Sequence, residues 1–304
     1  MRVNSGSQFL RLLDPNGKDM ELVILGSGGS TTIPRPGCEC RVCTEARVKG
    51  IPYARSGSSL FVEDINLLFD TPEEIASQLD RERIKAVDYI FYTHWHPDHT
   101  FGMRIVERMY KFWLDMFVRG NDPRNKVKVC ALDKVMEDLK SMGYRGGSFF
   151  RYYEKSGLIE TTELANGTPF KIGSFMITPF EVQTTYNIST VFLLQENQKR
   201  VVYAPCDVKP FPQNSKLKNL DLLIIGSFHL EGPLKEGITI PPDNPLRVEL
   251  FSPKEIQELA KELNAKETLV THIEEEWGKT YDEYKRLENE CTLKFAYDGM
   301  RTKI

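Results

Sequence analysis

Short apolar runs separated by polar turns make up much of this chain, and they predict a protein rich in β-strands. Several runs are apolar at nearly every position, a pattern typical of strands that are buried on both faces. The expected strands cover residues 21–25, 58–62, 66–70, 87–92, 127–131, 161–164, 169–172, 175–182, 189–195, 200–204, 220–225 and 267–271. Polar or glycine-containing turns lie between them, as in a multi-stranded fold.

Segments with helical spacing of apolar residues alternate with these strands. The expected helices begin at Glu73 and cover residues 100–117, 132–142 and 252–263. Asp70 or Thr71 is the expected cap of the first helix, and the apolar residues of 100–117 are expected to face the core. The glycines and aromatic residues of 143–155 predict either a mobile flap at the active site or a surface excursion.

This mixture of strands and helices predicts an α/β fold. The chain shows no internal repeat and no linker, so we expect one domain over residues 20–304 after an N-terminal extension over residues 1–19. Of its 304 residues, 40% are hydrophobic and 27% are charged, as in an ordinary globular protein.

Charge and hydropathy narrow the choice of partners. The net charge of −3 gives no basic footprint for nucleic acid, although a local basic patch is not excluded. No apolar run reaches the ~18 residues of a membrane span, and residues 1–6 lack a signal-peptide core. The six cysteines do not suggest a disulfide scaffold. We therefore expect a cytoplasmic protein that does not contact a membrane.

A cluster of imidazoles follows the expected strand 87–92. Three of the five histidines, His94, His96 and His99, lie within six positions, and Asp98 stands beside the last of them. Imidazole nitrogen and carboxylate oxygen together suit zinc, manganese or iron. The cluster therefore predicts a metal site at the end of a strand. The alternative is a polar loop in which the histidines have no common role.

Three thiols form a second candidate metal site. Cys38, Cys40 and Cys43 lie within six residues, in a proline- and glycine-containing loop. Such spacing in a reducing compartment is typical of structural zinc, which requires four protein ligands. The fourth ligand must come from elsewhere in the chain. Three unligated thiols are the alternative.

The pattern His94-x-His96-x-Asp98-His99 resembles the signature of the metallo-β-lactamase superfamily. The resemblance implies an αββα sandwich with a metal site at one edge of two facing sheets. It also implies that His94 and His96 bind one ion, and that Asp98 and His99 bind a second. The glycine turn of residues 26–30 and the cysteine spacing are similar to the branch that contains PhnP-like cyclic phosphodiesterases and PqqB.

The same resemblance extends to three residues later in the chain. It implies that Asp207 bridges the two metals, that His272 binds the second metal, and that His229 is the general acid. Each follows an expected strand, where the sandwich would bring it near residues 94–99. A turn aspartate and a core histidine are the alternatives for Asp207 and His272.

Two departures from the branch affect the metal sites. The histidine expected for the first metal after strand 175–182 is missing, and Thr185 stands in its place, so that this metal is expected to bind weakly. The fourth ligand of the cysteine site, a histidine in PhnP, corresponds to Glu275 here. A site of three thiolates and one carboxylate is expected, although a fourth thiolate or an imidazole is commoner.

These observations lead to a functional hypothesis. We expect a metal-dependent phosphodiesterase that cleaves a small cyclic or nucleotide-like phosphate through a metal-bound hydroxide. It would hold structural zinc at the cysteines and one or two zinc or manganese ions at the active site, with Asp98 and His229 as catalytic residues. A PqqB-like non-catalytic or altered-chemistry member with a depleted first metal site, an RNA-processing nuclease and a lactonase are the alternatives. A homodimer is left open.

Overall fold

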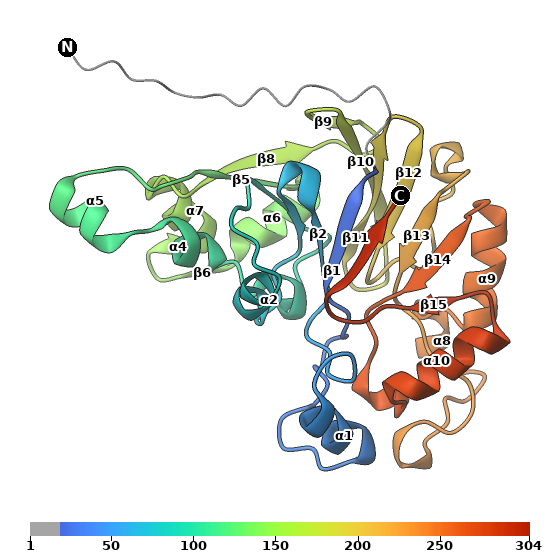
Figure 1. Cartoon of the computed structure of the whole chain (residues 1–304). Coiled ribbons are helices and arrows are strands. Elements are labelled where there is room, and N and C mark those ends of the chain that lie inside the picture. The colour runs from blue at the N-terminus through green and yellow to red at the C-terminus, as the bar shows by residue number, and fades with distance from the viewer. Residues whose placement is uncertain (1–18) are drawn as a thin grey trace.

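Two β-sheets lie face to face in the computed structural model of the chain, which describes residues 19–304 (Figure 1). The first sheet has the strand order β16 (Met300–Lys303), β1 (Glu21–Gly26), β2 (Ser59–Val62), β3 (Leu67–Phe69), β4 (Tyr89–Phe91), β5 (Val127–Leu132) and β8 (Ile159–Leu164). The second has the order β15 (Lys294–Phe295), β14 (Glu267–Val270), β13 (Leu222–Ile225), β12 (Lys199–Ala204), β11 (Ile188–Glu196), β10 (Phe175–Gln183) and β9 (Phe170–Ile172).

Helices cover the outer faces of both sheets. The described α-helices are α1 (Arg41–Lys49), α2 (Ile75–Arg81), α3 (Pro97–Thr100), α4 (Ile105–Tyr110), α5 (Trp113–Arg119), α6 (Asp133–Ser141), α7 (Phe149–Lys155), α8 (Leu246–Glu249), α9 (Pro253–Glu262) and α10 (Tyr281–Glu290). Helices α2, α4, α6 and α7 share a core with the first sheet, and α9 and α10 share one with the second. These four layers confirm the predicted αββα sandwich.

Residues from the two inner faces form a third core between the sheets. Phe69 of the first sheet packs its ring against Phe192 and Tyr203 of the second, with ring centroids 5.2 and 5.1 Å apart. Its neighbour Leu68 points the other way, into the core beneath the helices. Alternate residues of one strand therefore enter two different cores, which explains the nearly continuous apolar runs.

Four adjacent strands of each sheet are parallel. Strands β3, β4, β5 and β8 run in parallel in the first sheet, and β12, β13, β14 and β15 do so in the second. In such sheets, ligands bind beyond the carboxyl ends of the strands. The segments that follow β3, β4, β12 and β14 are therefore the ones that form the candidate site.

The predicted helix over 100–117 is wrong in extent and in the burial of its second half. The helix is interrupted between α4 and α5, where Lys111 and Phe112 have extended backbone angles. Trp113 and Phe117 of α5 are both about two-thirds exposed, so their helical spacing does not mark a core face. Figure 1 shows α5 projecting from the first sheet and its helices. Spacing alone could not show that no element packs onto this face.

Segment 143–155 forms a short hairpin, β6 (Gly143–Tyr144) and β7 (Gly147–Ser148), followed by α7. Phe150 and Tyr153 of α7 are buried in the core beneath α6. Neither alternative describes the whole segment, because α7 packs these two aromatic side chains into the core. The expected extension lies outside the described residues except for Asp19. None of the helices in residues 19–304 combines the length and apolarity that a bilayer crossing requires.

Candidate metal centre

Imidazole, carboxylate and thiol groups converge where the carboxyl ends of the parallel strands meet. Among the described residues these groups are His94, His96, Asp98, His99, Cys206, Asp207 and His272. They form three sets, in each of which one ligand atom per residue lies within 4.8 Å of the others: His94, His96 and Asp207; Asp98, His99 and His272; and His94, His99 and Cys206, which takes one histidine from each of the other two. The structure thus brings together the six predicted active-site ligands and adds Cys206. Their role as ligands stays a prediction.

Left-handed backbone conformations orient several side chains of the site. Asp70, Asp207 and His272 follow β3, β12 and β14, and their φ angles are 59°, 53° and 55°. This left-handed region is sparsely populated by residues with side chains, and such strain clusters at functional sites. Each strand therefore ends in a sharp turn that directs its next polar side chain toward the neighbouring strand ends.

The first set consists of His94, His96 and Asp207. Nε2 of His94 lies 3.0 Å from Nδ1 of His96 and 3.8 Å from Oδ2 of Asp207. Nδ1 of His96 lies 3.5 Å from the same carboxylate oxygen. Thr93 Oγ1 contacts Nδ1 of His94 at 2.9 Å, which fixes the imidazole ring so that Nε2 faces the other two ligands.

The second set consists of Asp98, His99 and His272. The two Nε2 atoms lie 3.3 Å apart, and Oδ2 of Asp98 lies 3.4 Å from each. Glu274 Oε1 is 3.3 Å from Nδ1 of His272, on the other side of that ring. Both rings therefore present Nε2 to the same point.

A residue that the sequence analysis assigned to a helix cap holds this arrangement in place. Asp70 is fully buried, and its Oδ2 lies 2.9 Å from Nδ1 of His99. It also accepts hydrogen bonds from the backbone N–H and the hydroxyl of Thr93, both at 2.8 Å. The predicted cap is wrong: the residue at the start of α2 is Glu74. A carboxylate behind a ligating imidazole is the usual second layer of a metal site.

Charge also favours a cation at this point. Burial of His99 opposes its charged form and would lower the pKa of its imidazole. The carboxylates of Asp70 and Asp98 have the larger effect and raise this pKa to about 10. Burial likewise opposes ionisation of Asp98, yet His99 and His272 hold its pKa well below its ordinary value. The pKa values of both His99 and His272 are thus raised beside the carboxylate of Asp98. The donor set and its second layer fit a divalent metal ion, whose binding would displace protons from these imidazoles.

Cys206 was not singled out by the sequence analysis. The side chain is buried. Its Sγ lies within 4.8 Å of a ring nitrogen of His94, from the first set, and of a ring nitrogen of His99, from the second. Burial alone would raise the pKa of this thiol, but His272, His94 and His96 lower it well below its ordinary value. The only sequence signal was its place beside Asp207 at the end of a strand. A cysteine at the end of a strand does not by itself indicate a metal ligand. Only the fold shows which histidines lie next to it.

Asn187 occupies the region of the missing histidine. Its Nδ2 donates to Oδ2 of Asp207 at 2.9 Å and lies 3.4 Å from Nε2 of His96. Thr185, the expected replacement, lines an adjoining cavity with His96 and Asp207. The polar contact with the first set therefore comes from Asn187, two residues further along the chain.

His229 does not join the metal-binding groups. Its side chain is buried, and Nδ1 lies 3.4 Å from the carbonyl oxygen of Leu230. The preceding residue, Phe228, lines the cavity beside the metal centre, but His229 is not among the lining residues. Its role as general acid stays a prediction.

A cavity of about 640 Å³ opens onto both sets of ligands. His96, Asp98, Asp207 and His272 lie at its polar end. Its apolar walls are formed by Phe228, Leu234, Ile238, Ile240, Leu246, Leu250 and Trp277. Most of this wall belongs to the segment between β13 and α9, which crosses in front of the metal centre.

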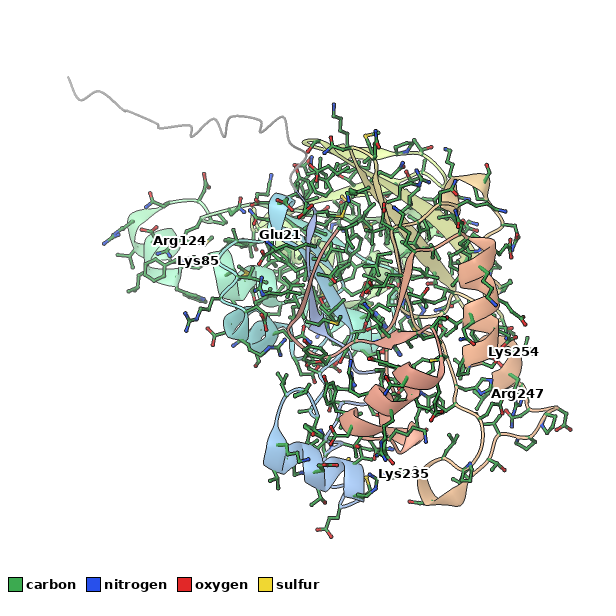
Figure 2. All side chains as sticks on the ribbon, turned by 45° about the vertical axis from the view of Figure 1, so that its right-hand side comes forward. Glu21, Lys85, Arg124, Lys235, Arg247 and Lys254 are labelled. Carbon is green, nitrogen blue, oxygen red and sulfur yellow. The ribbon has the colours of Figure 1, made fainter. Side chains whose placement is uncertain are left out.

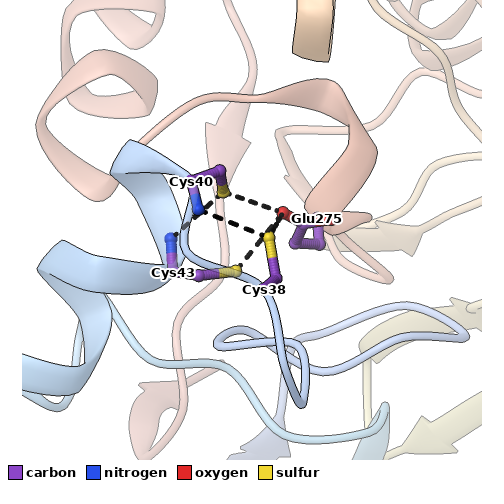
Figure 3. A group of neighbouring side chains, drawn as sticks. All are labelled: Cys38, Cys40, Cys43 and Glu275. Carbon is purple, nitrogen blue, oxygen red and sulfur yellow. Dashed lines mark hydrogen bonds between the residues drawn. The ribbon is translucent and has the colours of Figure 1, made fainter.

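The second predicted metal site is also assembled. Figure 3 shows Cys38, Cys40 and Cys43 around the side chain of Glu275. Their Sγ atoms lie 3.6, 3.1 and 3.3 Å from Oε1 of Glu275. Burial, with the nearby carboxylate, raises the pKa of Cys43 to about 12. Three thiols gathered on one carboxylate fit a zinc ion that would replace the thiol protons.

Lys235 connects this cysteine cluster to the cavity wall. Its Nζ donates to both carboxylate oxygens of Glu275 at 2.8 Å and lies 3.2 Å from Sγ of Cys38. Burial opposes ionisation of Glu275, but hydrogen bonds from Lys235 and Cys40 lower its pKa below the usual value. Figure 2 shows Lys235 beside α1 at the lower end of the molecule.

Comparisons with known proteins agree with this architecture. A family profile described as "Beta-lactamase superfamily domain" matches residues 65–273. An octanoyltransferase from Porphyromonas gingivalis is 25% identical over 168 residues, which are 54% of this chain and 30% of that protein. The chain thus spans less than a third of the length of this curated relative.

Two solved structures show the same fold. A diphosphatase from the PhnP family is 21% identical, with a TM-score of 0.66 over 94% of this chain and 97% of that one. Zinc-bound PqqB from Methylobacterium extorquens is 14% identical, with a TM-score of 0.67 over 94% of this chain and all of that one. At these identities the likeness establishes the fold alone. The chemistry has to be inferred from the residues of the site.

Replacing one thiol tests the cysteine cluster. We expect Cys40→Ser to lower both the zinc content and the melting temperature, because the metal binds only the folded loop. Elemental analysis and thermal unfolding measure the two effects. Cys291→Ser, a half-buried cysteine outside the cluster, is the matched control and should change neither. Unchanged zinc content in Cys40→Ser would contradict a zinc site here.

Replacing Asp70 tests the second layer of the active site. Asp70→Asn should weaken metal binding ~10–100-fold, since the amide cannot hold His99 with the same charge and tautomer. Titration with zinc in competition with a chromophoric chelator measures the affinity. Asp138→Asn, on α6, serves as the control. Equal affinities in Asp70→Asn and wild type would show that His99 does not depend on this carboxylate.

Proposed function

This chain belongs to the metallo-β-lactamase superfamily, and on that premise we propose that it is a metal-dependent hydrolase that cleaves a small phosphodiester. The observation that supports the proposal is the pair of adjacent ligand sets that face one cavity. The rings of His94 and His99, one from each set, have centroids 4.3 Å apart. Two-metal sites for phosphoryl chemistry hold their ions ~3.5–4 Å apart.

The residues of the site have separate tasks in this proposal. Bound divalent ions would supply Lewis-acid activation of water and neutralise charge on the phosphoryl group. Asp98 ligates the second ion and keeps His99 and His272 facing it. Asp70 and Thr93 hold His99 and His94 in their ring orientations. His229 stays our proposed proton donor to the leaving group on the resemblance alone, since its side chain is buried and does not line the cavity.

The cavity favours a small substrate with an apolar portion. Its volume of about 640 Å³ lies within the range of small-molecule sites. Apolar side chains line the wall away from the metal ligands, so one ester group of the substrate would be aryl or alkyl. Besides the candidate ligands, the cavity lining carries three carboxylates, Glu236, Glu274 and Glu276, against two cations, Arg35 and Lys235, and this excess of negative charge would disfavour the backbone of RNA. These features weigh against the nuclease alternative.

The similarity to a diphosphatase of the PhnP family supports phosphoester chemistry, and the similarity to PqqB supports the altered-chemistry alternative. The six cysteines are all free, which agrees with our proposal of a cytoplasmic protein. The metal ions would be zinc or manganese at the active site and zinc at the cysteines.

A substrate panel tests the proposed reaction. We expect protein loaded with zinc or manganese to cleave bis(p-nitrophenyl) phosphate or a cyclic nucleotide, and to leave lactones and RNA intact. Asp98→Asn should lower kcat/KM by more than ~10²-fold, since it removes a ligand rather than a second-layer group. Asp138→Asn should keep wild-type activity. If the loaded protein cleaves no phosphodiester in the panel, the non-catalytic alternative is the better one.

The role of His229 is tested with two leaving groups. Removing a general acid usually costs ~10²–10⁴-fold in rate, and a good leaving group needs the acid least. His229→Ala should therefore slow an alkyl phosphodiester far more than a p-nitrophenyl ester. Equal losses on the two esters would assign His229 to the packing beneath the cavity.

A further inference from the structure

We propose that Cys206 is a metal ligand shared by the two sets at the centre of the site. The inference rests on the metal-dependent function proposed above and concerns how the ions are held. It also replaces the expectation that the first metal is depleted.

The position of the sulfur is the first argument. Sγ of Cys206 lies within 4.8 Å of ligand nitrogens of both His94 and His99. The sulfur atom therefore lies between an imidazole of the first set and an imidazole of the second. Among the described histidine, cysteine and acidic residues outside the two sets, only Cys206 groups with members of both.

The backbone around Cys206 explains how it reaches this position. In an extended strand, consecutive side chains point to opposite faces. The φ of 53° at Asp207 breaks this alternation, so that Cys206 and Asp207 both face the site. The hydroxyl of Ser189 donates to the carbonyl oxygen of Cys206 at 3.1 Å and holds the turn.

Gly226 allows the strand ends to approach one another. A Cβ at this residue would lie 1.8 Å from the carbonyl oxygen of Pro205 and 2.8 Å from Cβ of His272. Only glycine fits between the segment that carries Cys206 and the residue that closes the second set. The close approach brings the thiol to the histidine of the neighbouring strand end.

The ligand count is the second argument. His94, His96 and Asp207 give the first ion three protein ligands, and Asp98, His99 and His272 give the second ion three. A shared thiolate raises each set to four, the usual number for tetrahedral zinc. Thiolate is also a soft ligand that selects zinc over manganese. Cys130, a fully buried cysteine outside both candidate metal sites, has no such surroundings, since it packs among apolar residues between the sheets.

Replacing the thiol tests this inference without substrate. Cys206→Ser should bind zinc at the active site at least ~10-fold more weakly than wild type and lose one or both of its ions on dialysis. In the cobalt-substituted protein it should also lose part of the near-ultraviolet sulfur-to-cobalt absorption. The remainder comes from Cys38, Cys40 and Cys43. Cys130→Ser is the matched control and should keep the full spectrum and metal content.

Two further measurements test the proposal even if Cys206→Ser does not fold. Cys206→Asp restores an anionic ligand, and it should hold two ions and shift the preference from zinc toward manganese. In the wild-type protein, alkylation followed by mass spectrometry should label Cys206 only after a chelator has removed the metal. Equal labelling with and without metal, or a Cys206→Ser spectrum identical to wild type, would overturn the proposal.

The outcome is separate from that of the proposed reaction. A protein that holds two ions through Cys206 but cleaves no phosphodiester would contradict only the phosphodiesterase. A phosphodiesterase whose metal content and cobalt spectrum are unchanged in Cys206→Ser would contradict only the shared thiolate.

Discussion

The buried carboxylate of Asp70 is the interaction on which the metal centre depends. It accepts hydrogen bonds from the backbone and hydroxyl of Thr93 and pairs with His99, and Thr93 in turn contacts His94. One side chain at the end of β3 thus orients a ligand from each set at the end of β4. A buried carboxylate is costly unless its oxygens are satisfied, and here both are. The same contacts tie the ends of two parallel strands together.

Local patterns in the sequence predicted much of the fold and part of the site. The apolar runs located the central strands of both sheets, because strands buried on both faces leave a continuous signal. The spacing of residues 94–99 and of the three cysteines predicted both candidate metal sites, since these groups lie close together in the chain. Asp207, His272 and Glu275 came from the resemblance to a family, and the structure places them beside the local ligands.

The remaining features depend on geometry that no local pattern encodes. Cys206 reaches the site only because Asp207 has a left-handed backbone and Gly226 lets two strand ends approach. Asn187 contacts the first set because of the path of the loop between β10 and β11. The spacing of residues 100–117 is helical in the sequence, yet the exposure of α5 depends on which elements pack nearby.

The ion pair between Lys235 and Glu275 joins the cysteine cluster to the segment that forms most of the cavity wall. Glu275 belongs to the cysteine cluster, whereas Lys235 belongs to the segment whose apolar residues face the metal centre. Three thiolates and a carboxylate around one zinc ion leave an excess of negative charge, which the ammonium group of Lys235 partly balances. Filling the cysteine cluster with zinc would therefore strengthen the electrostatic anchor of the cavity wall. A zinc ion in the cysteine cluster would thus restrict movement of the wall away from the candidate metal centre.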